Sequence, residues 1–72
     1  MQQDVRYDWK KVMSGKEVAR ILEKNGWKFM RQKGSHMMFA KKGFTCVVPE
    51  HKEIKIGTLN SIKKKVIFVE SN

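Results

Sequence analysis

The sequence has few of the features that anchor or cross-link a chain. It contains one cysteine, Cys46, which excludes an intramolecular disulfide and is typical of proteins in a reducing cytoplasm. No apolar run approaches the ~20 residues of a membrane span, and the first residues lack the apolar stretch of a signal peptide. We therefore expect a cytoplasmic protein.

Acidic residues are also scarce, because seven Asp and Glu stand against sixteen Lys and Arg in 72 residues, a net charge of +9. Residues 14–45 alone hold eight basic and two acidic residues, a balance of +6. This charge points first to nucleic acid, with a merely solubilising surface as the alternative. A domain this short buries only roughly 60% of its unfolded surface, which argues against a large pocket, so no cofactor is expected.

Metal-ligand patterns are absent from the sequence as well. The nitrogen and sulfur candidates are His36, Cys46 and His51, and none of them has the paired spacing of a CxxC or HxxxH motif. Cys46 lies in an apolar segment and is expected to be a small core residue. We predict no metal site.

Clear helix signals come first. Ser14 and Glu17 have the spacing of a capping box, which predicts that a helix begins there. Gly26 is suited to the left-handed conformation that ends a helix, and Trp27 is expected to fold back on Leu22. A first helix is therefore expected between Ser14 and Gly26.

Three strands and a second helix are expected to follow. Aromatic and β-branched segments at 27–33, 36–40 and 44–48 are separated by turn residues, and helical spacing of apolar residues returns from Ile56 to Val66. The segment 67–69 fits either a continued helix or a short edge strand. The lysines at 63–65 fit either a helix C-terminus or phosphate contact.

The resulting order, α-β-β-β-α, predicts an α+β fold in which two helices cover one face of a three-stranded antiparallel sheet. We expect a flexible N-terminal extension over residues 1–12, a single domain over 13–69 and a tail over 70–72. The extension contains two aromatic residues, so docking of a partner there is also conceivable.

His36 is the strongest candidate for chemistry. A histidine in a small domain is more often structural, but His36 begins the second strand directly after Gly34 and Ser35, with Arg31 and Lys33 across the turn. An imidazole beside phosphate-binding cations is the combination that a metal-free ribonuclease uses. By spacing alone this signal is weak.

Four motifs together resemble the HicA family of bacterial toxins, which are small mRNA interferases. The resemblance runs from Ser14 to about Val66 and is carried by Glu23-Lys24-Asn25-Gly26-Trp27, Arg31-Gln32-Lys33-Gly34-Ser35-His36, Val47-Val48-Pro49 with His51, and Ile56-Gly57-Thr58-Leu59-Asn60-Ser61-Ile62. It implies a fold like the double-stranded-RNA-binding domain, metal-independent cleavage of mRNA, and neutralisation by a HicB-type antitoxin. It places the family's catalytic histidine on His36, with Gly34 and Ser35 completing that motif.

The leading hypothesis is therefore a toxin endoribonuclease in which His36 is general base or acid. The second proton-transfer role stays open between His51, a lysine and water. The alternatives are a non-catalytic RNA-binding module with the same fold and a protein-interaction domain. The residues predicted to bind RNA are Lys28, Arg31, Lys33, Lys41 and Lys42.

Overall fold

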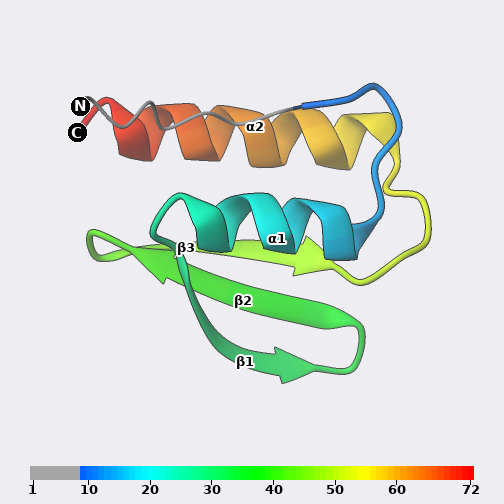
Figure 1. The fold of residues 1–72 in the computed structure, drawn as a ribbon, viewed down its shortest axis with the longest axis horizontal. Helices are drawn as coiled ribbons and strands as arrows, with labels where there is room; N and C mark the ends of the chain where they lie inside the picture. The colour runs from blue at the N-terminus through cyan, green and yellow to red at the C-terminus, as the bar shows by residue number, and fades with distance from the viewer. Residues whose placement is uncertain (1–8) are drawn as a thin grey trace.

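The computed structural model describes residues 9–72 and confirms the expected order of elements. Residues 1–8, which belong to the predicted extension, lie outside the described part of the chain. The elements are α1 (Gly15–Lys24), β1 (Lys28–Lys33), β2 (His36–Lys41), β3 (Phe44–Pro49) and α2 (Ile56–Glu70) (Figure 1). The three strands form one antiparallel sheet in the order β1-β2-β3.

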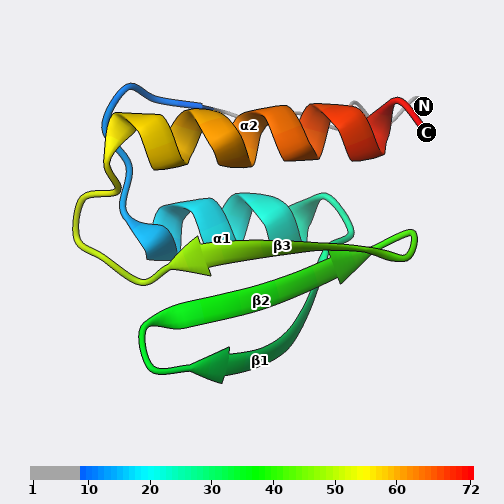
Figure 2. The same cartoon turned by 180° about the vertical axis from the view of Figure 1, so that it is seen from behind.

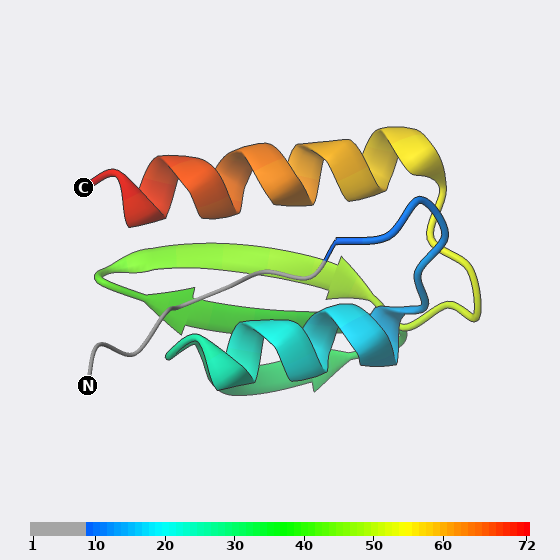
Figure 3. The same ribbon diagram turned by 45° about the horizontal axis from the view of Figure 1, so that its top comes forward.

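Both helices lie on the same side of the sheet, as predicted. Figure 3 shows α1 in front of the sheet with its axis along the strands, and α2 running in the same way next to β3. Alternate residues of β2 and β3 point towards the helices and are buried. The opposite face of the sheet is turned to the viewer in Figure 2, and no helix of residues 9–72 covers it. The buried apolar residues are Met13, Val18, Leu22, Trp27, Met37, Phe39, Cys46, Val48, Ile54, Leu59, Ile62, Val66 and Val69.

Both ends of α1 form as the sequence predicts. The backbone N–H of Glu17 donates to the Ser14 hydroxyl over 3.1 Å, and the backbone N–H of Ser14 donates to the Glu17 carboxylate over 2.8 Å. The Ser14 backbone hydrogen bond, helped by Lys10, lowers the pKa of Glu17. At the other end, the N–H of Trp27 donates to the Leu22 oxygen over 3.0 Å, which completes a Schellman motif.

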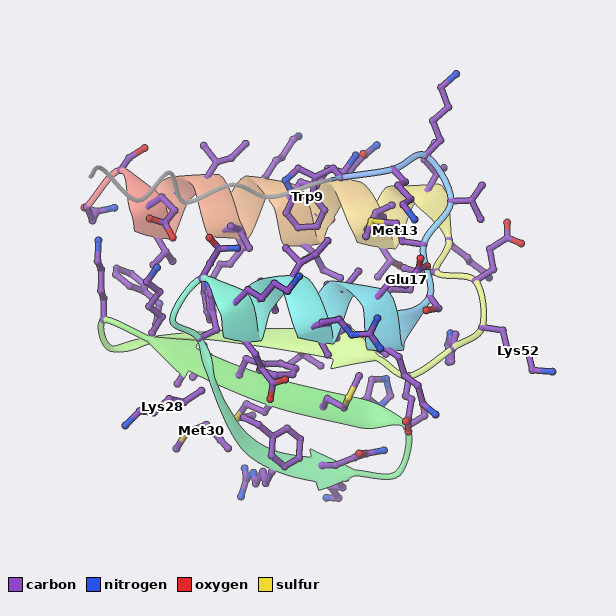
Figure 4. The ribbon with its side chains drawn as sticks, in the orientation of Figure 1. Trp9, Met13, Glu17, Lys28, Met30 and Lys52 are labelled. Atoms are coloured by element: carbon purple, nitrogen blue, oxygen red, sulfur yellow. The ribbon has the colours of Figure 1, made fainter. Side chains whose placement is uncertain are left out.

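The second helix is longer than the apolar spacing alone indicated, because residues 67–69 continue it to Glu70. The lysines at 63–65 therefore lie in the middle of α2, and placing them at a helix C-terminus is wrong. Lys63 has a different partner, since its ammonium is 5.7 Å from the ring centroid of Trp9. Trp9 is half-buried against the core and lies over α2 in Figure 4, so the folded part of the chain includes this residue of the predicted extension.

A β-bulge in β1 is a feature that the sequence did not predict. The register shifts between Phe29 and Arg31, and Met30 is the extra residue. Phe29 consequently lies opposite Phe39 on the helix-covered side, and the two rings meet edge to face with centroids 5.7 Å apart. Before the bulge, Lys28 lies opposite Ala40 on the side of the sheet that the helices do not cover. The bulge thereby keeps the basic residues of β1 on one face.

Candidate active site

Two rows of cross-strand neighbours bring the candidate residues together on the uncovered side of the sheet. In one row, Lys33 lies opposite His36, which lies opposite Pro49. In the adjacent row, Arg31, Met38 and Val47 are neighbours in the same way. Because Met37 and Phe39 are buried under the helices, the alternate residues of β2 face the other way. We call this side the open face; its residues are Lys28, Arg31, Lys33, His36, Met38, Ala40, Thr45, Val47 and Pro49.

The turn before His36 is held in place by Glu50. Its backbone N–H donates to the Ser35 oxygen over 2.5 Å, and the Gln32 side chain donates to the Glu50 carboxylate over 2.7 Å and to the Gly34 oxygen over 2.9 Å. Gly34 has a φ of +61°, a conformation that favours glycine. The Gly-Ser-His segment is thus fixed to the end of β3, and His36 begins β2 with its side chain exposed.

His36 borders two hollows of the surface. The first, which we call the sheet hollow, has a volume of about 320 Å³ and lies on the open face. Its apolar residues are Met38 and Val47, and its basic residues are Arg31 and Lys33. An apolar floor and two cations therefore lie directly beside the imidazole.

The second hollow, which we call the loop hollow, has a volume of about 350 Å³ and lies between the end of β3 and the start of α2. It contains His36 and His51 together, although they are far apart in sequence. The backbone oxygen of His51 accepts a hydrogen bond of 2.8 Å from the N–H of Gly15, which ties this loop to the start of α1. The other residues that line the loop hollow are Val47, Pro49, Lys55 and Thr58.

Sequence reasoning missed five of the residues that line these hollows, which are Met38, Val47, Pro49, Lys55 and Thr58. Met38 and Val47 lie in the predicted second and third strands, and alternation along these strands is the signal that would have placed them on the open face. Lys55 and Thr58 reach the loop hollow through the path of the loop that follows Pro49. No local pattern in the sequence indicates that path.

The five predicted RNA-binding cations fall into different settings. Lys28, Arg31 and Lys33 are exposed on the open face, and Lys42 is exposed in the β2–β3 turn at the far end of β2 from His36. Lys41 already has partners, because its ammonium donates to the Asn25 backbone oxygen over 2.5 Å and to the Glu70 carboxylate over 2.6 Å. Contact with RNA stays a prediction for all five.

Cys46 is buried in the core, as expected, and burial raises the pKa of its thiol to about 11. Within residues 9–72, no three His, Cys, Asp or Glu side chains are grouped as ligands for a metal ion. Neither α1 nor α2 has the length and apolar composition needed to cross a membrane.

The chain was compared with known protein families. The family described as HicA toxin of bacterial toxin-antitoxin matches residues 15–66, which is 52 of the 72 residues. The matched segment contains all three strands and both histidines. Comparisons with curated proteins and with solved structures gave no match.

Proposed function

The chain belongs to the HicA family, the toxins of bacterial toxin–antitoxin systems, and from this we propose that it is an endoribonuclease that cuts mRNA with His36 in a proton-transfer role. The observation that carries the proposal is the shared hollow of His36 and His51, with Arg31 and Lys33 on the other side of His36. Two imidazoles beside cations can supply both proton transfers of RNA cleavage.

The proposed reaction begins when His36 takes the proton from a ribose 2′-hydroxyl. The 2′-oxygen attacks the adjacent phosphorus, and the bond from phosphorus to the 5′-oxygen of the next nucleotide breaks. His51 donates a proton to that departing oxygen. The products are a 2′,3′-cyclic phosphate and a 5′-hydroxyl end. Lys33 and Lys55 stabilise the negative charge that grows on the phosphoryl oxygens.

The decisive experiment incubates defined RNA with the purified protein and with a His36→Ala variant, both in the presence of EDTA. We expect cleavage by the wild type, cyclic-phosphate ends and no cleavage by the variant. Equal cleavage by both proteins would remove His36 from the mechanism. Intact RNA with salt-sensitive binding would instead favour the non-catalytic RNA-binding module. An Arg20→Gln variant, altered at an exposed residue of α1, controls for a general effect of a surface substitution and should cleave like the wild type.

Family membership also implies an antitoxin partner, and we propose that it is a HicB-type protein with an acidic surface. A net charge of +9 favours association with such a surface. We expect the antitoxin to protect RNA from cleavage and to slow hydrogen exchange in β1 and β2. Inhibition without any protection of these strands would mean that it binds elsewhere.

A further inference from the structure

We propose that the sheet hollow holds the nucleobase next to the scissile phosphate and that Arg31 determines which base is accepted. This inference rests on the ribonuclease activity proposed above. The hollow contains His36 at one edge, so a base seated in it lies beside the imidazole that would act on the backbone.

The floor of the sheet hollow suits the flat face of a base. Met38 is half-buried on β2, and Val47, its neighbour on β3, is 45% exposed. Exposed apolar surface of this kind is available for stacking. A single-stranded base can be splayed out and stacked on side chains or on the plane of an arginine.

The size of the sheet hollow restricts the substrate. Its volume of about 320 Å³ is near the lower end of the range of roughly 300–1,000 Å³ for small-ligand sites. A hollow of that size accommodates one unstacked base. A-form duplex is recognised instead by shape across a wide minor groove. We therefore infer that the RNA is single-stranded at the cut, although the fold has the order of a double-stranded-RNA-binding domain.

The polar side chains that line the sheet hollow favour one type of base edge. Arg31 and Lys33 are donors only, and no carboxylate or side-chain amide is among the lining residues. Arginine forms a bidentate pair of hydrogen bonds with O6 and N7 of guanine. The corresponding edge of adenine carries an amino donor, which needs an acceptor. We therefore expect guanine to be preferred over adenine.

The register of β1 supports Arg31 rather than Lys33 as the base-reading residue. Arg31 is the cross-strand neighbour of Met38, in the row that forms the floor, while Lys33 is the neighbour of His36 in the next row. Rows of the same face are roughly 6.5 Å apart along a strand. The structure thus assigns Lys33 to the phosphate beside His36 and Arg31 to the base.

The first test maps cut positions in a random-sequence RNA. We expect guanine to be enriched at one position flanking the cut. In an Arg31→Gln variant the preference at that position should move towards adenine, because glutamine pairs with adenine, by about fivefold or more. Lys33→Gln should slow cleavage without changing the base distribution. Arg20→Gln, the same exchange on α1, should leave both rate and distribution unchanged.

A second test detects the base directly and does not depend on cleavage. The methionine methyl groups are labelled with ¹³C, the Met38 signal is identified with Met38→Leu, and guanosine 5′-monophosphate is added to the His36→Ala variant. The Met38 signal should shift, and more than with adenosine 5′-monophosphate. The signal of Met37, buried on the other side of the same strand, should stay in place.

The two tests separate this inference from the proposed function. The base site would be overturned if Arg31→Gln cut RNA with the same base distribution as the wild type and the Met38 signal did not respond to the nucleotide; the proposed ribonuclease activity would be unaffected. Conversely, the ribonuclease activity would be overturned, and base binding retained, if guanosine 5′-monophosphate shifted the Met38 signal but the wild type cut no RNA.

Discussion

Gly15 lies directly against the backbone oxygen of Pro49, so closely that a Cβ atom at position 15 would collide with it. This contact brings the first turn of α1 onto the end of β3. From there the N–H of Gly15 holds the backbone oxygen of His51. A residue without a side chain is therefore needed for the loop that carries His51 to reach the loop hollow.

We predict that Gly15→Ala lowers the free energy of unfolding by about 1 to 3 kcal/mol, because the strand end must move to admit the methyl group. Urea denaturation measures this effect. Gly57→Ala is the matched control, since a Cβ atom at Gly57 has nothing within 4 Å. In the first turn of α2 alanine should be neutral or stabilising by up to about 1 kcal/mol. Equal losses in both variants would contradict the steric explanation.

The role of His51 as the proton donor predicts a dependence on the leaving group. His51→Ala should slow cleavage of ordinary RNA by about 100-fold or more, the usual scale for general acid catalysis. It should have little effect on a nucleoside 3′-(p-nitrophenyl phosphate), whose leaving group departs without a proton. His36→Ala should impair both substrates. If His51→Ala slowed both substrates equally, His51 would not be the acid.

The contact of Lys41 with Glu70 predicts a stabilising role for this lysine. Its ammonium joins the end of α1, through the Asn25 oxygen, to the end of α2. Lys41→Met should lower the free energy of unfolding by about 1 to 2 kcal/mol, and Glu70→Gln should add little to it in the double variant. Lys42→Met, at an exposed neighbour, should stay within about 0.5 kcal/mol of wild type. Fully additive effects at 41 and 70 would show that the pair does not couple.

From the burial of the Cys46 thiol we predict that the protein loses stability in alkaline solution. Burial raises its pKa from 9.0 to about 11, so below pH 9 both folded and unfolded chains keep the proton and the thiol has no effect. Between pH 9 and 11 the unfolded chain loses the proton first, and stability falls by an amount on the order of 2 to 3 kcal/mol. When the free energy of unfolding is measured by urea denaturation at each pH, Cys46→Ala should lack this fall between pH 9 and 11. Parallel curves for both proteins would contradict the prediction.

Local signals in the sequence predicted the elements well. Both ends of α1 rest on hydrogen bonds between residues at most five positions apart, from Ser14 with Glu17 to Trp27 with Leu22. The hairpin turns depend on glycines with positive φ at 34 and 43. Such patterns involve only residues close together in the sequence, and they were sufficient to predict the order α-β-β-β-α.

The site was predicted less completely, because its geometry depends on tertiary contacts. His36 and His51 share a hollow only after β2 and β3 pair and the loop after Pro49 is held by Gly15. The partner of Lys41 is 29 residues away in sequence. The bulge at Met30 had no signal, since Phe29 and Met30 are both apolar and either could have faced the core.

The bulge at Met30 also divides β1 into two segments whose side-chain phases are independent of each other. From Arg31 to the turn, pairing with Met38 and His36 determines which side chains face the open side. Before Met30, the contact of Phe29 with Phe39 determines it. With the same length but regular pairing in place of the bulge, Met30 would lie opposite Phe39 and Lys28 would turn towards the helices, while Arg31 and Lys33 would stay where they are. A substitution at Lys28 can therefore change the chemistry of one half of this edge strand without altering the pairing that holds Arg31 and Lys33 beside β2.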